Sequence, residues 1–436
     1  MQKLRCAVLG YGHRGASYAV YAKSHPEQLE IIAVIDPSLF KRQTAQKEYG
    51  ISDEMLFDNL NDFIAKGVKC DFIINGTMDQ LHYQTTIELL KHKYNILLEK
   101  PVTSNPEELL HIQHLAEENK CKVVVCHVLR YTLFYSQIKK ILDSGELGKV
   151  MNIQVNEHVG TLHFIKAYVR GKWHSEKECG SGLLLAKCCH DTDLMCWLNN
   201  ETEPELVSSF GERAHFTEEN APEGATQYCY QCPKKDECEY NAFKTELEQD
   251  SIPFYTWCRI NKPYDEITKE EKIEYLKNDI YGQCVYKIKD MDIVDRQCVS
   301  VKFKNGSVAT LNMIGGTILA GRHIHILCEK GEIFGYIEEN KFRVVKFAQD
   351  FLHVTNKIID LDEIKKLEGD GNSITGHYGG DYYIMRDLIK YLSGEQTSCS
   401  TTVLNDSINS HLVCYAAEKS RKENVVVNID KTYKNQ

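Results

Sequence analysis

The chain has 436 residues, of which 42% are hydrophobic and 26% are charged, and its formal net charge is -10. These proportions are typical of a globular protein of two or three domains. The acidic balance excludes nucleic acid as the main partner, and no apolar run reaches the ~20 residues that a membrane span needs. The N-terminus lacks the apolar core of a secretory signal, and most of the 17 cysteines lie in apolar runs, so we expect a cytoplasmic protein.

Residues 1–126 alternate between short apolar runs and helical patterns. Strands are expected near residues 4–10, 30–36, 71–75, 95–98 and 122–126, with helices between them. Each run is continuously apolar, which is typical of a parallel sheet covered on both faces. We therefore predict an α/β fold that begins with a Rossmann domain, a doubly wound parallel sheet.

The pattern changes in residues 127–436, which we predict to form an α+β domain for substrate binding and oligomerisation. Residues 151–159 alternate like an antiparallel strand, and Lys304-Asn305-Gly306 between two β-type runs predicts a hairpin. Residues about 213–290 are polar, irregular and rich in cysteine, which indicates an insertion. The domain should contain an open, mainly antiparallel sheet with a large exposed apolar face.

A glycine-rich motif follows the first predicted strand and opens a helix. Residues 10–15 fit G-x-G-x-x-G, in which Gly10 permits a tight turn and Gly12 lets the backbone approach a pyrophosphate. Gly15 lets helix and strand pack closely, and the helix N-terminus favours phosphate. We expect a dinucleotide to contact this loop, including Tyr11, His13 and Arg14.

Two further strand ends complete the predicted cofactor site. Asp36 can accept hydrogen bonds from a ribose hydroxyl and repel a 2′-phosphate, which favours NAD. Lys41 and Arg42 follow it and could take a phosphate, which leaves NADP open. Asn75, Gly76 and Thr77 end another strand on the ligand side and are expected to border the ribose or nicotinamide.

Glu99-Lys100-Pro101 ends the next strand on the same side, where a lysine can reach a substrate oxygen beside a nicotinamide. With the glycine motif and the α+β second half, this sequence resembles the Gfo/Idh/MocA family of glucose–fructose oxidoreductase and inositol dehydrogenase. The resemblance implies that Lys100 binds the hydroxyl undergoing oxidation and that Glu99 positions Lys100. It also implies hydride transfer between nicotinamide and a sugar or cyclitol carbon, and subunits paired as a homodimer or homotetramer.

The resemblance extends to a second catalytic stretch, residues 185–193. His190 falls on the family histidine and could act as general base. The family often has Asp four residues earlier, but this chain has Ala186. Lys187 lies on nearly the same helical face, and with Lys100 it could lower the pKa of His190 or bind the substrate oxygen.

Four other residues are candidates for substrate contacts, with structural roles as the alternative. They are Arg130, His158, Asp191 and His377. Asp191 and Asp193 are two positions apart on a helix, so at most one should reach the pocket. His377 belongs to a glycine-rich segment, 376–381, that could instead contact another subunit.

A cysteine cluster lies in the predicted insertion. Cys229 and Cys232 have C-x2-C spacing, Cys238 follows, and Cys284 is preferred over Cys258 as a fourth ligand. Such spacing suits a structural zinc ion, with an iron–sulfur cluster, a redox disulfide or free buried thiols as alternatives.

The leading interpretation is an NAD(P)-dependent oxidoreductase acting on a sugar, cyclitol or derivative. A redox-neutral glycosidase or epimerase is an alternative, since Ala186 in place of Asp suggests altered acid–base chemistry. A non-catalytic NAD-sensing protein is the third possibility, against which the presence of Lys100 and His190 argues.

Overall fold

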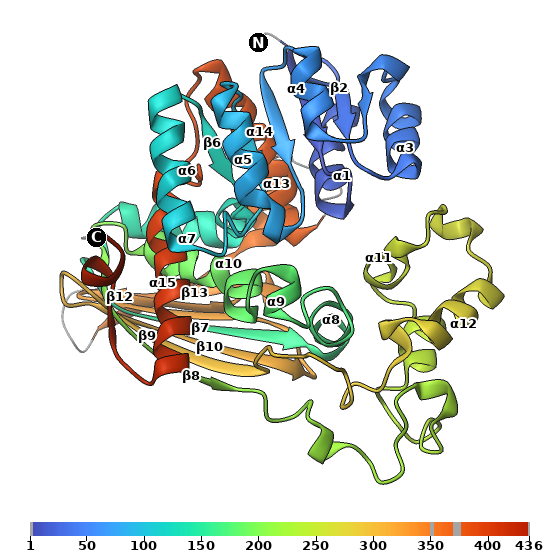
Figure 1. Ribbon diagram of the computed structural model, residues 1–436. Helices are drawn as coiled ribbons and strands as arrows, with labels where there is room; N and C mark the ends of the chain where they lie inside the picture. The colour runs from blue at the N-terminus through green and yellow to red at the C-terminus, as the bar shows by residue number, and fades with distance from the viewer. Residues whose placement is uncertain (1–2, 349–352, 369–375, 435–436) are drawn as a thin grey trace.

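The computed structural model describes residues 3–348, 353–368 and 376–434, which build two sheets with their covering helices (Figure 1). The first sheet is parallel, with the strand order β3-β2-β1-β4-β5-β6. This is the order of a doubly wound dinucleotide-binding domain. The predicted Rossmann domain is therefore confirmed.

The elements of this domain follow the predicted alternation. Its strands are β1 (Leu4–Leu9), β2 (Leu29–Ile35), β3 (Leu56–Phe57), β4 (Phe72–Asn75), β5 (Ile96–Leu98) and β6 (Val123–Val125). Its helices are α1 (His13–Ala19), α2 (Tyr21–Ser24), α3 (Leu39–Tyr49), α4 (Leu60–Lys66), α5 (His82–Lys91) and α6 (Pro106–Asn119). The sequence reading missed β3 and α4, because two residues of strand carry no periodicity.

Local signals explain where these helices begin and end. The Ser38 side chain caps α3, which ends at Gly50 in the left-handed region (φ 68°). Asn105 caps α6, whose first residue is Pro106, since a proline at this position has no amide hydrogen to leave unpaired.

The second sheet has nine strands in the order β14-β13-β12-β11-β7-β10-β9-β8-β15. They are β7 (Val150–Gly160), β8 (Pro204–Glu212), β9 (Arg296–Phe303), β10 (Val308–Thr317), β11 (Gly321–Cys328), β12 (Gly331–Tyr336), β13 (Lys341–Phe347), β14 (Val354–Asp360) and β15 (Val427–Asn428). β7 pairs parallel with β10, and the other neighbouring pairs are antiparallel. The mainly antiparallel sheet is thus confirmed, although β7 is antiparallel only toward β11.

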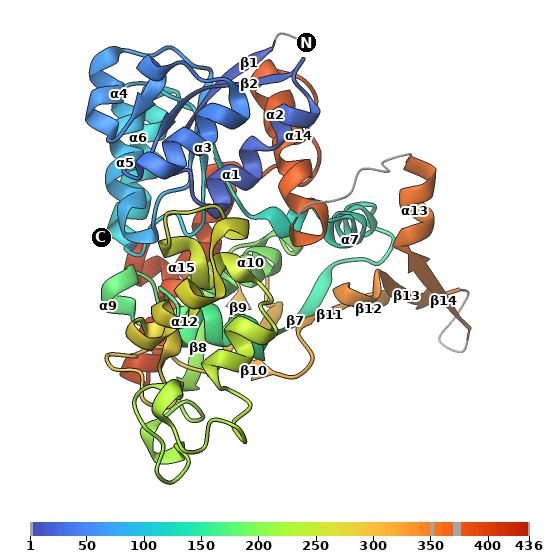
Figure 2. The ribbon, with the colours of Figure 1, turned by 90° about the vertical axis from the view of Figure 1, so that its right-hand side faces the viewer.

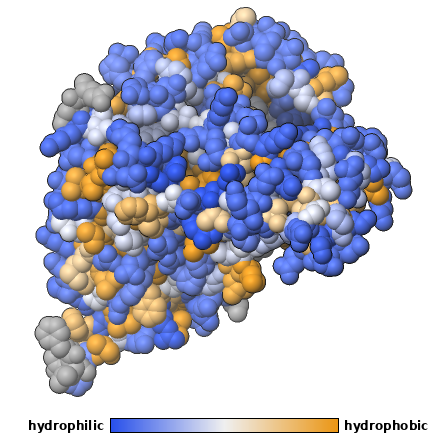
Figure 3. Space-filling view, turned by 60° about the horizontal axis from the view of Figure 1, so that its bottom comes forward, coloured by the Kyte–Doolittle hydropathy of each residue, from blue (hydrophilic) through white to orange (hydrophobic). Residues whose placement is uncertain are grey.

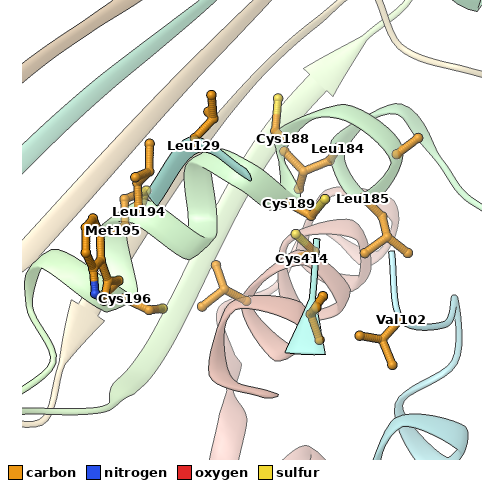
Figure 4. Packing of buried hydrophobic residues seen from close by; sticks show 14 of the residues in the cluster. Val102, Leu129, Leu184, Leu185, Cys188, Cys189, Leu194, Met195, Cys196 and Cys414 are labelled. Atoms are coloured by element: carbon orange, nitrogen blue, oxygen red, sulfur yellow. The ribbon is translucent and has the colours of Figure 1, made fainter. Parts of the chain in front are cut away.

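Helices α10 (Leu183–Leu198) and α15 (Leu404–Glu423) lie side by side against one face of this sheet. Outside the insertion, the other helices of this half are α7 (Leu133–Asp143), α8 (Thr161–Phe164), α9 (Glu176–Cys179), α13 (Leu361–Glu368) and α14 (Gly380–Ser393). Cys189 of α10 and Cys414 of α15 meet in a core that Leu185 and Val102 complete (Figure 4). The adjacent Cys188 and Cys189 are fully buried, as the sequence predicts.

The chain returns to the Rossmann domain near its end. Ile384, Met385 and Leu388 of α14 share a core with β1, α1 and α2, and the Thr402 carbonyl accepts from the Val125 amide (2.8 Å). A division into residues 1–126 and 127–436 therefore leaves α14 with the wrong domain, because its apolar face is buried on the first sheet.

The uncovered face of the large sheet is more polar than expected. On β7, Ile153, Val155 and Glu157 are buried on the helix side, and the alternate residues face away. Those alternate residues are Asn152, Gln154, Asn156 and His158. From this side, hydrophilic and hydrophobic side chains are interspersed (Figure 3). The prediction of a large apolar face is wrong, because the alternating pattern places amides and histidines there.

The predicted insertion spans the connection from β8 to β9. It contains α11 (Pro253–Thr256) and α12 (Lys269–Asn278), and its own core consists of Trp257, Ile267, Leu276 and Tyr281. Both ribbon views place α11 beneath the Rossmann domain, next to α1 (Figures 1 and 2). Among the residues described, no helix is long and apolar enough to cross a membrane.

Candidate active site

The glycine loop between β1 and α1 has the geometry that a bound dinucleotide requires. Gly10 has φ +83°, and a Cβ there would lie 2.7 Å from the Gly76 carbonyl oxygen. A Cβ on Gly15 would lie 2.2 Å from the Gly10 oxygen, whereas one on Gly12 would meet nothing within 4 Å. Gly10 and Gly15 therefore allow the chain to pack, and Gly12 leaves open space for a ligand.

Asp36 is buried at the end of β2 and orders the loop around it. Its carboxylate accepts from the amides of Tyr11 and Ser38, each at 2.9 Å. Lys41 Nζ lies 3.6 Å from the same carboxylate, and Arg42 donates to the Asp36 carbonyl at 2.6 Å. Lys41 and Arg42, the two cations that could bind the 2′-phosphate of NADP, are thus both in contact with Asp36.

The sequence predicts that Arg14 contacts the dinucleotide, but its side chain is bonded to other groups of the protein. Its Nε donates to Glu99 (2.7 Å), and its Nη2 donates to Asp381 (2.7 Å) and to the Tyr18 hydroxyl (2.5 Å). Burial alone would raise the pKa of Glu99, but the charges of Arg14 and Lys100 lower it to about 2. Arg14 therefore joins three segments, the glycine loop, the Glu99 turn and the segment that contains His377.

Asn75 also has a structural role, because its buried amide is satisfied within the protein. It donates to Thr85 and Thr86 on α5 and accepts from the Thr77 hydroxyl (2.9 Å). These bonds hold the turn after β4, where the backbone of Gly76 packs against Gly15. In this turn, only the backbone and Thr77 remain candidates for cofactor contact.

Lys100 reaches from the end of β5 to the first turn of α10. Its Nζ donates to the Ala186 carbonyl at 2.8 Å, and the Glu99 carboxylate accepts from the Lys100 amide. Ala186 occupies the position where the family often has Asp. A backbone oxygen, rather than a carboxylate, therefore orients the Lys100 ammonium.

His190 lies one turn further along α10, with its ring buried. Its Nδ1 has no hydrogen-bond partner within the structure described, and its ring centroid lies 5.8 Å from that of His127 and 6.2 Å from that of His377. Burial, followed by the charges of Lys100 and neighbouring groups, lowers the pKa of His190 well below its ordinary value. The ring is therefore held as a neutral imidazole.

A buried ionic network lies behind these residues. Arg322 of β11 pairs with Glu157 of β7 (2.7 Å) and with Asp191 (2.8 Å), and Lys187 Nζ is 3.4 Å from Glu157. Asp191 is thus held by Arg322 rather than offered to a substrate. The sequence reading missed Glu157 and Arg322, since only the pairing of β7 with β11 brings them together.

Two other predicted substrate residues lie elsewhere. Arg130 is buried and forms a two-point ion pair with Asp193 through Nε (2.7 Å) and Nη2 (2.5 Å), because helix α10 turns Asp193 toward it. His158 is on the uncovered face of the large sheet, where its ring lies 5.4 Å from that of His323. Of the four candidates, His377 remains beside His190.

The predicted zinc ligands line one small cavity together with Arg170, but as free thiols. In the part of the chain that the structure describes, no group of three or more His, Cys, Asp or Glu could hold a metal ion. Arg170 Nη2 donates to Cys229 Sγ (3.5 Å), and burial raises the pKa of Cys238 and Cys284, which favours neutral thiols. The structure therefore does not support a metal at Cys229, Cys232, Cys238 and Cys284.

Together, the doubly wound sheet, the open space at Gly12 and the contact of Lys100 with α10 are features of an NAD-binding oxidoreductase. The chain belongs to the Gfo/Idh/MocA family: residues 4–127 match the model described as oxidoreductase family, NAD-binding Rossmann fold, and residues 135–230 match the GFO/IDH/MocA C-terminal domain. The predicted family is confirmed.

Similar proteins are oxidoreductases and dehydrogenases. Oxidoreductase YteT of Bacillus subtilis is 23% identical, over 73% of this chain and 72% of its own. Inositol 2-dehydrogenase of Corynebacterium glutamicum is 25% identical over 45% of this chain and about half (54%) of its own. Among solved structures, levoglucosan dehydrogenase with NADH and levoglucosan has a TM-score of 0.70 at 14% identity, covering 98% of this chain and 100% of that one. WlbA dehydrogenase of Bordetella pertussis, in complex with NADH and UDP-GlcNAcA, has a TM-score of 0.67 at 17% identity, covering 98% of each chain.

Gly12→Ala and Gly15→Ala should separate cofactor binding from folding. The Gly12 substitution adds a methyl group where only a ligand would come close, so the melting temperature should stay unchanged while NAD affinity falls. The Gly15 substitution collides with the Gly10 backbone and should also lower the melting temperature. Thermal melting and NADH fluorescence titration measure the two effects; unchanged NADH affinity in Gly12→Ala would contradict this role of the loop.

Breaking the Arg130–Asp193 pair should destabilise the fold. Arg130→Met leaves Asp193 as an uncompensated buried carboxylate, so we expect a loss of about 3–5 kcal/mol in the free energy of unfolding, measured by urea denaturation. The double variant Arg130→Met/Asp193→Leu removes both charges and should recover part of that loss. If Arg130→Met keeps its stability and loses only substrate affinity, the assignment to the core is wrong.

Proposed function

We propose that this protein is an NAD-dependent dehydrogenase that oxidises a hydroxyl-bearing carbon of a sugar, cyclitol or sugar derivative. The observation that carries the proposal is that Lys100, at the carboxyl edge of the Rossmann sheet, reaches α10 one turn before His190. The Lys100 ammonium donates only to a backbone carbonyl, and His190 Nδ1 has no partner in the described structure. A proton donor and a proton acceptor are thus both available to a substrate hydroxyl.

Lys100, His190 and Glu99 have separate roles in this reaction. One hydrogen of the Lys100 ammonium is bonded to Ala186, so the others can bind the hydroxyl oxygen and stabilise negative charge on it. His190, neutral at physiological pH, accepts the hydroxyl proton. Glu99 stays ionised and holds Arg14 and the Lys100 amide, which fixes the turn. NAD⁺, held by the glycine loop and Asp36, supplies the hydride acceptor when bound.

The names of the relatives favour this reading over the alternatives. They include inositol 2-dehydrogenase and scyllo-inositol 2-dehydrogenase, and none of those reported supports a redox-neutral glycosidase, an epimerase or a non-catalytic sensor. The engagement of Lys41 and Arg42 with Asp36 favours NAD over NADP as the cofactor.

We also propose a homo-oligomer that assembles through the edge of the large sheet. Strands β13 and β14 and helix α13 project from the body of the molecule (Figure 2). β14 is an edge strand, and its Val354 and Ile358 side chains are 55% and 50% exposed. Such an edge in a stable protein is normally covered, and a second copy of the chain would cover it.

Light scattering should therefore show a dimer or tetramer. Val354→Asp/Ile358→Asp should shift the protein toward the monomer, because each charge would be buried in the contact. Val426→Asp, at an exposed apolar residue (63%) by the opposite sheet edge, is the control and should not change the mass. A monomeric wild type at working concentration would refute the proposal.

Lys100→Met should lower kcat by about 10²–10³-fold with NAD binding intact, since it removes the donor to the developing oxyanion.

The pH profile of kcat/KM tests the role of His190. Because its pKa is lowered well below its ordinary value, the imidazole stays neutral at pH 7, so the acid limb of kcat/KM should lie at a lower pH than for an ordinary histidine. Turnover and stopped-flow NADH formation with a panel of cyclitols and sugars measure both. Full turnover by Lys100→Met, or an acid limb centred near pH 7, would contradict the mechanism.

A further inference from the structure

Lys172 places a second ammonium group at the same edge of the Rossmann sheet as Lys100. Its Nζ lies 3.3 Å from Met78 Sδ and 4.0 Å from the centroid of the Trp173 ring. Met78 directly follows Thr77 in the turn after β4, so Lys172 reaches the ligand side of the sheet. A thioether is a weak acceptor, and a ring face attracts the cation without accepting a full hydrogen bond.

The nearby carboxylate is already committed. Asp79 Oδ2 accepts from Trp173 Nε1 (2.9 Å) and from the Ser181 hydroxyl (2.7 Å), and no carboxylate of the described residues lies within 4.0 Å of Lys172 Nζ. Burial and the charge of Lys100 lower the pKa of Lys172, and Asp79 opposes this shift only in part. A half-buried ammonium without an oxygen acceptor is costly in the free protein unless a ligand completes it.

Aromatic rings connect this ammonium to the cofactor loop. The insertion contributes two adjacent rings through α11. Phe254 stacks on His13 of the glycine loop with centroids 3.9 Å apart, and Tyr255 stacks on His163 at 5.6 Å and bonds to it at 3.1 Å. Trp173 lies 6.4 Å from Tyr255, which continues the row to Lys172. Apolar ring faces beside a few directed polar groups are typical of small-molecule sites.

Lys187 and Arg322 differ from Lys172, since both are paired with Glu157. Lys100 and Lys172, by contrast, have no side-chain carboxylate within ion-pair distance among the described residues. Lys100 is assigned to the reacting hydroxyl in the proposed mechanism. Lys172 is left for a different group on the substrate.

We propose that the substrate carries an anionic oxygen group, a carboxylate or a phosphate, and that Lys172 binds this group while the aromatic row packs on the sugar ring. The inference rests on the proposed dehydrogenase function and narrows its substrate class to acidic sugars. Lys172 is then a specificity-determining residue, because it acts on affinity for the charged group and not on the reacting hydroxyl.

The test compares three hexoses that differ at C6: D-glucose, D-glucuronate and D-glucose 6-phosphate. Calorimetry on the NADH-loaded full-length protein measures binding, and NADH formation with NAD⁺ measures kcat and KM. We expect an acidic member to bind at least about tenfold more tightly than glucose. Lys172→Met should remove that preference, mainly through KM, and Lys172→Arg should restore most of it. Lys177→Met, an exposed lysine five residues later, is the control.

Each outcome is informative. A preference for glucuronate identifies the group as a carboxylate, and a preference for glucose 6-phosphate identifies it as a phosphate. Equal binding of all three sugars, absence of binding by both acidic sugars, or a preference unchanged in Lys172→Met would overturn the inference. Turnover of glucose with no acid preference would overturn it and leave the dehydrogenase function standing. Binding of an acidic sugar through Lys172 without any NADH formation would support the anion site and count against the dehydrogenase.

Discussion

The ionic junction at Arg14 is the interaction on which the rest of the site depends. Arg14 comes from the second half of the glycine motif, Glu99 precedes Lys100, and Asp381 lies in the first turn of α14, 367 positions after Arg14. Because all three groups are buried or half-buried, removing one would leave the others uncompensated. The same side chain thus couples the cofactor loop, the Lys100 turn and the segment that carries His377.

Around this junction, some charged side chains are paired with one another in buried ion pairs, whereas the Lys100 ammonium has no carboxylate partner in the described part of the chain and can bind a ligand. Arg322 forms ion pairs with Asp191 of α10 and with Glu157 of β7. Arg130, at the start of the second domain, pairs with Asp193. Lys100 is directed instead by a backbone carbonyl, since Ala186 has no carboxylate to pair with it. The Lys100 ammonium can therefore still attract a negatively charged oxygen of a ligand.

The insertion contributes to the site more than its irregular sequence suggests. Its small core begins at Trp257, directly after α11, whose Phe254 and Tyr255 stack on histidines of the glycine loop and of α8. Neither ring stood out in the sequence, because an aromatic pair in a polar stretch has no periodicity. Arg14 shows the same limit: it was placed correctly in the glycine loop, but its partners Glu99 and Asp381 are invisible without the fold.

The sequence by itself determined the Rossmann half, because continuous apolar runs, capping residues and the spacing of three glycines are local signals that act over a few residues. Through resemblance to a family, it also predicted that Lys100 and His190 belong to one site. Only the tertiary structure showed which groups Arg130, Asn75 and Asp191 contact and on which face His158 lies, and it placed α14 against the core of the first sheet. These contacts depend on which charged or polar groups of distant segments meet in the fold. An alternating strand pattern does not say which face of the sheet the helices will cover.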